Sequence, residues 1–171
     1  KNDPNALFIL GIIYYEGKYV KQDIKKALKY LRLAANQNFA DAQCFLGIIY
    51  LRNEFVEKNI NISIDYLYLS ANNNHHEAQF ILGTVFLCEE KYRDINKSIF
   101  YYKESSNFNN SRAKNNLAII YTNRNFDCIG YSIELLEEAV RLKDYLSMYN
   151  LSHIFFYYEI ENKYDTIIDM L

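Results

Sequence analysis

The sequence predicts an all-α fold in which pairs of antiparallel helices repeat along the chain. One pattern of small and large apolar residues occurs five times, at steps of 36, 36, 35 and 34 residues. Within each copy the apolar residues recur every three or four positions, which is the period of a helix and not of a strand. The 171 residues contain one proline and five glycines, so little interrupts helix formation. A unit of this length that repeats in register predicts a helical repeat array.

The first helix of each copy carries the pattern AxxxLGxxY, in full at residues 6–14 and 42–50 and with substitutions in the later copies. We expect these helices at residues 6–14, 42–50, 78–86, 113–121 and 147–155. A glycine in a helix interior costs about 1 kcal/mol relative to alanine. Gly11, Gly47 and Gly83 therefore predict a contact with the paired helix that is too close for a side chain.

The second helix combines small residues with large apolar ones and is expected at residues 27–35, 63–71, 98–106 and 132–140. Its small residues Ala34, Ser70 and Ser105 are predicted to lie opposite the glycines. Tyrosine and phenylalanine side chains are expected to fill the space on either side, so most aromatic residues belong to the core.

Polar residues mark the predicted helix ends. Asn38, Asn74 and Asn109 share one place just after the second helix, and asparagine tolerates the left-handed conformation that ends helices. Asp41 and Ser111 lie near the start of the next helix, where a side-chain oxygen can cap the backbone.

The combined pattern resembles the Sel-1-like repeat, a relative of the tetratricopeptide repeat, over about residues 5–155. The resemblance implies a right-handed α-solenoid, or superhelix, of antiparallel helix pairs with about four and a half repeats, and a scaffold or adaptor role. The first copy matches the family pattern at Ala6, Leu10, Gly11, Tyr14, Gly17, Val20, Asp23, Lys26, Ala27, Tyr30, Ala34 and Ala35.

We place the repeats in a single array at about residues 5–40, 41–76, 77–111 and 112–145, with a partial repeat at 146–171. The copies depart from the family pattern along the chain, because Asn53, Glu89 and Arg124 stand where the first copy has Gly17. Residues 162–171 are interpreted either as a terminal cap or as a cut end. The chain starts without a methionine, so we expect a piece of a longer protein.

Charge and hydropathy exclude two classes of partner. The 19 basic and 21 acidic residues give a formal net charge of −2, which argues against nucleic acid because that partner demands a basic excess. The longest apolar run, residues 6–15, is far shorter than the roughly 20 residues that span a bilayer, so no membrane insertion is expected.

No constellation of side chains predicts catalysis. The sequence has no phosphate-cradling glycine loop and no nucleophile beside a base. His75, His76 and Glu77 cluster in sequence, but no further His or Cys lies one helical turn on, so we interpret them as a solvated turn between repeats. We therefore expect a chain that is not an enzyme, with no catalytic residue, cofactor or metal.

The cellular compartment is indicated by two opposing features. Three cysteines without a CxxC pair suit reduced thiols and favour the cytoplasm. The alternative is the lumen of the endoplasmic reticulum, which four N-x-[ST] sequons weakly favour. These sequons begin at Asn61, Asn96, Asn109 and Asn150.

The predicted binding site is the concave groove lined by the first helices. Side chains three before, one after and four after the repeat glycine are expected to face it, which gives an apolar stripe that becomes polar in the fourth repeat. The open alternative is that these side chains pack against one another and leave no groove. The stripe consists of Phe8, Ile12, Tyr15, Cys44, Ile48, Leu51, Phe80, Thr84, Leu87, Asn115, Ile119 and Thr122.

The function predicted from this site is a scaffold or adaptor that binds a partner protein or peptide. The alternatives are a regulatory arm of a larger signalling enzyme, such as a protein kinase, and a lumenal adaptor in membrane-protein degradation. Residues 7–13 are apolar on all sides, whereas a surface helix shows a polar stripe. We therefore expect this helix to have lost an upstream repeat or to be covered by another chain, including end-to-end self-association.

Overall fold

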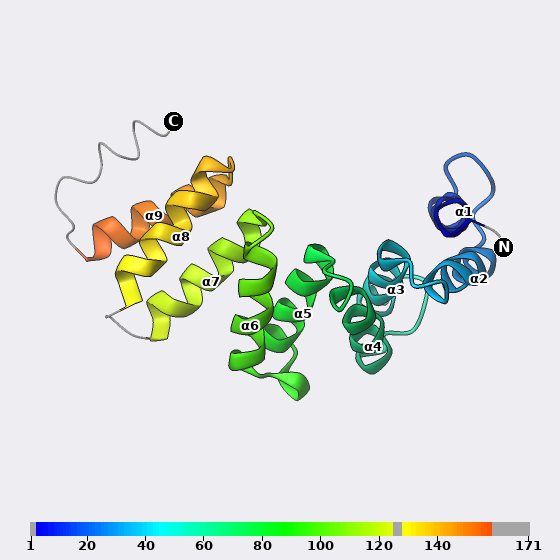
Figure 1. The fold of residues 1–171 in the computed structure, drawn as a ribbon, viewed down its shortest axis with the longest axis horizontal. Helices are drawn as coiled ribbons and strands as arrows, with labels where there is room; N and C mark the ends of the chain where they lie inside the picture. Colours follow the sequence, from blue (N-terminus) through cyan, green and yellow to red (C-terminus); the bar gives the residue numbers. More distant parts are fainter. Residues whose placement is uncertain (1–2, 125–127, 159–171) are drawn as a thin grey trace. The chain divides into compact units, whose positions relative to one another are not determined.

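The computed structural model describes residues 3–124 and 128–158, with the side chain of Arg124 excepted. Residues 162–171, interpreted above as a cap or a cut end, lie outside the described residues. The chain divides into two compact units, residues 1–82 and 83–171, and each is described by itself. All regular structure in the described residues is helical, as the sequence predicted (Figure 1).

The helices alternate between first and second helices of successive repeats. First helices pack against the second helix that follows them in α1/α2, α3/α4 and α7/α8. Second helices pack on the next first helix in α2/α3, α6/α7 and α8/α9. A short 3₁₀ segment, Glu90–Tyr92, precedes α6. The first helices are α1 (Pro4–Glu16), α3 (Ala40–Arg52), α5 (His76–Cys88), α7 (Ser111–Arg124) and α9 (Tyr145–Tyr157). The second helices are α2 (Ile24–Ala35), α4 (Ile60–Ala71), α6 (Ile95–Ser106) and α8 (Ile129–Arg141).

The glycine contact predicted from the repeat is present in each of the first three copies. A Cβ atom added at Gly47 would lie 2.6 Å from Cγ of Leu67, and one added at Gly83 would lie 2.7 Å from Cδ1 of Tyr102. Gly11 is equally close to its paired helix. Because real Cβ contacts are longer than this, only glycine permits the observed approach of the two helices.

The predicted neighbours of the glycines were wrong by one helical turn. The atoms nearest to Gly47 belong to Leu67 and Ser63 and not to Ser70. Ser70 lies instead beside the start of α3, where its hydroxyl donates to the carbonyl oxygen of Ala40 at 2.8 Å. The contact therefore pairs a glycine with a large side chain on the facing helix, which fills the space that the missing side chain leaves.

A buried serine strengthens this contact. The hydroxyl of Ser63 donates to the carbonyl oxygen of Gly47 at 2.8 Å, and Ser98 donates to Gly83 at the same distance. Both serines are fully buried, so each hydroxyl needs a partner inside the protein. Serine suits this position in these two copies because it is small and because its hydroxyl can donate a hydrogen bond to the helix carbonyl.

The asparagines after the second helices end them as predicted. Asn38, Asn74 and Asn109 have φ values of 65°, 57° and 57°, and Lys143 takes the same conformation in the fourth copy. The capping prediction for Ser111 was wrong, because the oxygen that accepts the Ala113 N–H belongs to the preceding residue, Asn110. Asp41 likewise lies within the first turn of α3 and does not cap it.

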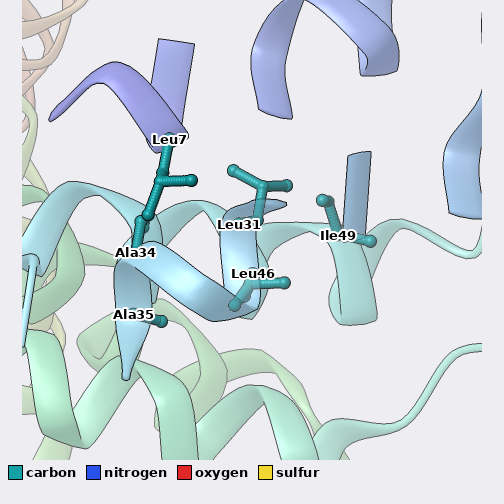
Figure 2. Close-up of a cluster of buried hydrophobic side chains, with 7 residues drawn as sticks. Leu7, Leu31, Ala34, Ala35, Leu46 and Ile49 are labelled. Atoms are coloured by element: carbon teal, nitrogen blue, oxygen red, sulfur yellow. The ribbon is translucent and has the colours of Figure 1, made fainter. Parts of the chain in front are cut away.

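Each layer of the core contains side chains from successive helices. Figure 2 shows Leu7 of α1 pointing toward Ala34 of α2, with Leu46 of α3 nearby. Aromatic rings stack at the ends of the helix pairs, as Tyr14 does on Tyr30 with centroids 5.8 Å apart. Equivalent stacked pairs are Tyr50 with Tyr66 and Phe86 with Tyr101, which confirms that these aromatic positions serve packing.

We predict that Gly47→Leu destabilises the protein by on the order of 1–3 kcal/mol, because the new side chain overpacks the contact with Leu67. Denaturant unfolding followed by circular dichroism measures the change. The matched control is Gly130→Ala, since Gly130 is an exposed residue of α8 with no atom near its added Cβ. That substitution should stabilise by about 0.5–1 kcal/mol. Wild-type stability in Gly47→Leu would show that the contact assignment is wrong.

Candidate functional site

The candidate site is built from the predicted stripe residues of the first helices, and those of each unit are described by themselves. In α1 the stripe residues Phe8 and Tyr15 are half-buried because they pack against α3 and its flanking residues. The ring of Tyr15 lies 5.2 Å from that of Phe45 and 5.4 Å from that of Phe55, and Phe8 lies 5.5 Å from Phe39. These two residues therefore join neighbouring repeats through aromatic rings that are not members of the stripe.

Two stripe residues have no surface to offer a partner. Cys44 is 4% exposed and Asn115 is 2% exposed. Asn115 connects α7 to α9, because its Oδ1 accepts from Nδ2 of Asn150 at 2.7 Å and from the hydroxyl of Ser147 at 3.3 Å. This buried amide maintains the spacing of the two helices.

The remaining stripe residues are partly accessible. Ile119 has 39% of its surface exposed, the largest fraction among them. Thr122 is half-buried and its hydroxyl donates to the Ala118 carbonyl, while the hydroxyl of Thr84 lies 3.1 Å from that of Tyr102. The other half-buried members are Ile12, Ile48, Leu51, Phe80 and Leu87.

A cavity of about 350 Å³ opens where α7 and α9 meet over α8. Ile119 and Thr122 of the predicted stripe line this cavity, so two of the stripe residues of the second unit belong to a concave surface. Its other lining residues are Asn123, Leu136, Asn150, His153, Ile154, Tyr157 and Tyr158.

The sequence interpretation missed the part of this site that α9 contributes. The predicted stripe ends with Thr122 of the fourth repeat and names no residue of α9. The position rule that gave the stripe assigns Tyr149, His153 and Phe156 when it is continued into this repeat. Tyr149 is 68% exposed and Phe156 is 77% exposed, so that rule would have found the accessible end of the stripe.

Among the described residues that line the cavity there is no Lys, Arg, Asp or Glu side chain. Its polar groups are the His153 imidazole, which stacks on Tyr157 with ring centroids 6.2 Å apart, the Asn123 and Asn150 amides, and the hydroxyls of Thr122, Tyr157 and Tyr158. Apolar and aromatic walls with a few hydrogen-bonding groups are the usual lining of a pocket that takes an apolar anchor. The cavity therefore suits an uncharged apolar or aromatic group.

Other clusters have structural explanations. His75 caps α5, since its Nδ1 accepts the Ala78 N–H at 3.2 Å, which leaves Nε2–H to donate to Asp41 at 3.3 Å. Across residues 3–124 and 128–158, no group of three or more His, Cys, Asp and Glu side chains is placed to hold a metal ion. None of the described helices is long and apolar enough to cross a membrane.

These helix pairs define an α-solenoid repeat protein. The sequence model of the Sel1 repeat matches residues 4–39, 40–75 and 76–107, and the chain belongs to this family. The fourth and fifth copies lie beyond the matched residues, although α7 and α8 form the same kind of pair. None of the curated proteins compared with the chain matches it.

Two solved structures are similar to this fold. A Sel1 repeat protein from Oxalobacter formigenes is 25% identical with a TM-score of 0.82, over 90% of this chain and 64% of its own. A protective antigen present in uropathogenic Escherichia coli strains, displaying an SLR fold, is 21% identical with a TM-score of 0.82. The match spans 88% of this chain and 33% of the antigen. The chain therefore spans less than two thirds of each of these proteins.

We predict that Cys44 resists alkylation at neutral pH while Cys88 reacts. Burial raises the pKa of the Cys44 thiol to about 12, with Glu77 and Asp41 acting in the same direction, so the reactive thiolate is scarce in the folded protein. Cys88 is exposed. Iodoacetamide labelling followed by peptide mass spectrometry measures both sites, with the urea-unfolded protein as the control. Equal labelling of the two thiols in the folded protein would contradict the burial of Cys44.

Proposed function

We propose that this chain binds a peptide segment of a partner protein on the face of its first helices. Sel1 repeats are generally protein-interaction scaffolds built on a non-catalytic fold. The observation that supports a specific site is the cavity between α7 and α9, which is lined by Ile119, Thr122 and His153. An apolar or aromatic side chain of the partner enters this cavity as the anchor.

The peptide form of the partner is inferred from the accessible stripe residues of each unit taken by itself. Apolar side chains that recur on a helix face suit an extended or helical segment with apolar anchors. Within the first unit, Ile12, Ile48 and Leu51 supply contacts that are shallower than the cavity, because all three are half-buried. At the cavity, the His153 imidazole can form a hydrogen bond with the bound peptide and so fix the direction in which the peptide lies.

The chain works as an adaptor and not as an enzyme in this proposal. A regulatory arm of a signalling enzyme, such as a protein kinase, uses the same surface, and only the partner differs. A lumenal adaptor in membrane-protein degradation differs in compartment. We propose the cytoplasm as the compartment, because the sequons that favour the lumen can be explained by packing within the repeat.

The sequons have a packing explanation that does not involve glycans. Ser63 and Ser98, the third residues of two sequons, are fully buried and bonded to the repeat glycines. In a third sequon, Nδ2 of Asn150 donates to Asn115 at 2.7 Å, and this is the nitrogen to which a glycan would be attached. The repeat therefore generates these motifs by itself, and free thiols at Cys44, Cys88 and Cys128 suit a reducing compartment.

Replacing Ile119 with Asp should weaken peptide binding by about tenfold or more. The carboxylate at the cavity mouth would lose its hydration when the apolar anchor enters. Peptides selected on the immobilised chain from a random-peptide phage library provide the ligands, and fluorescence anisotropy measures their affinity. Ile62→Asp is the matched control, since Ile62 is 36% exposed on α4 and lies away from the first-helix face.

Circular dichroism shows whether each variant keeps its fold. Selected peptides that bind Ile119→Asp as well as wild type would remove the cavity from the proposal. In the first repeats, Ile48→Asp and Phe80→Asp should also weaken binding while the helix content stays unchanged. Loss of the fold in both would identify these residues as core and would contradict a groove at that end.

The compartment is tested by expressing the chain behind a secretory signal peptide and treating the product with PNGase F. Modification should be absent at Asn150, because a glycan on its Nδ2 would break the bond to Asn115 and block the cavity. Asn61 is exposed and serves as the internal comparison. Secretion of a folded product that is fully glycosylated at Asn150 would contradict the cytoplasmic placement.

A further inference from the structure

The first helix has an apolar face that is open only in this repeat. Leu10 is 39% exposed. The residues at the same repeat position, Leu46, Leu82, Leu117 and Leu151, are each 0% exposed. One repeat position thus changes from surface to core between the first copy and every later copy.

Neighbouring positions of α1 show the same contrast. Ala6 is exposed, whereas Ala42 and Ala78 at the equivalent position are 0% exposed. Ile9 is 49% exposed, and Ile13 is half-buried where later copies have residues at 3% to 8%. The open face of α1, defined by Ala6, Ile9, Leu10 and Ile13, has no charged residue.

The later copies show what covers this face. For α3, α7 and α9 it is the second helix of the preceding repeat, since α2 packs on α3, α6 on α7 and α8 on α9. In the first of these layers, Ala35 of α2 forms one buried cluster with Ala42 and Leu46 of α3. Figure 2 labels Ala35 and Leu46 in this cluster. Gln43 of α3 also donates to the Ala35 carbonyl at 3.1 Å. The covering helix therefore brings small residues against the alanine and leucine of the next first helix.

We propose that the open face of α1 is an inter-repeat interface whose occupant is the second helix of a further Sel1-type repeat, supplied by polypeptide on the N-terminal side of α1. The argument is the continuity of this face with three interfaces of the same register. Terminal repeats of solenoids carry a polar outer face, and α1 instead keeps the residues of an internal repeat.

A fusion tests the proposal on the complete chain. A second copy of residues 4–39 is inserted directly in front of Pro4. Its last residue is then followed at once by a first helix, as residue 39 is followed by α3 at residue 40 in the chain itself. Proline is accepted at the first position of a helix, so the junction is compatible with α1. The added copy of α2 should raise the midpoint of thermal unfolding by about 5 °C or more, because repeat stabilities add. It should also slow hydrogen exchange of the α1 amides.

Leu10→Lys shows whether the gain comes from this face. In the chain alone the substitution should leave the unfolding midpoint almost unchanged, since Leu10 is already in contact with solvent. In the fusion it should remove most of the gain, because the lysine would then be buried against the added helix. Leu117→Lys is the matched control at a covered position and should unfold the second unit in both contexts.

Two results would overturn the proposal. One is a fusion that is no more stable than the chain or whose gain survives Leu10→Lys, since the face then does not accept a second helix. The other is a stable dimer of the chain alone in light scattering that Leu10→Lys converts to a monomer, which would assign the face to end-to-end self-association with a second copy. A monomeric chain together with a Leu10-dependent gain in the fusion supports the upstream repeat.

Discussion

The close contact between the two helices of each repeat is the constraint on which the rest of the structure depends. A helix glycine removes one side chain, and a large residue such as Leu67 or Tyr102 on the facing helix fills that space. In the second and third repeats a buried serine hydroxyl also donates a hydrogen bond to the carbonyl of the same glycine. The remaining faces of each helix pair contact other repeats or solvent.

Once the pairs are formed, the burial of every other position depends on what lies beside the pair. Leu10 and Leu46 occupy the same repeat position and differ only because α2 precedes α3 and no described helix precedes α1. The same dependence operates on the predicted groove. Phe8 and Tyr15 are drawn into contact with aromatic rings of the next repeat, whereas Ile119 meets a cavity.

The cavity of the second unit arises where the repeat departs from its consensus. The fourth and fifth copies have Ala118 and Ser152 in place of glycine, and their first helices are joined by a hydrogen bond from the side-chain amide of Asn150 to that of Asn115. The cavity with His153 and the exposed Tyr149 and Tyr157 therefore lie in copies beyond the residues that the family model matches.

The sequence alone determined the helix pairs, their register, the glycine contacts and the asparagine ends, because each of these depends on residues within one repeat and recurs at fixed spacing. It also selected Ile119 and Thr122 as surface residues. Only the tertiary structure decided that Cys44 and Asn115 are buried, that the glycines face residues such as Leu67, and that His153 completes a cavity. The physical reason is that burial and hollow space depend on the size of side chains contributed by neighbouring repeats, and a pattern shared by all repeats does not contain that information.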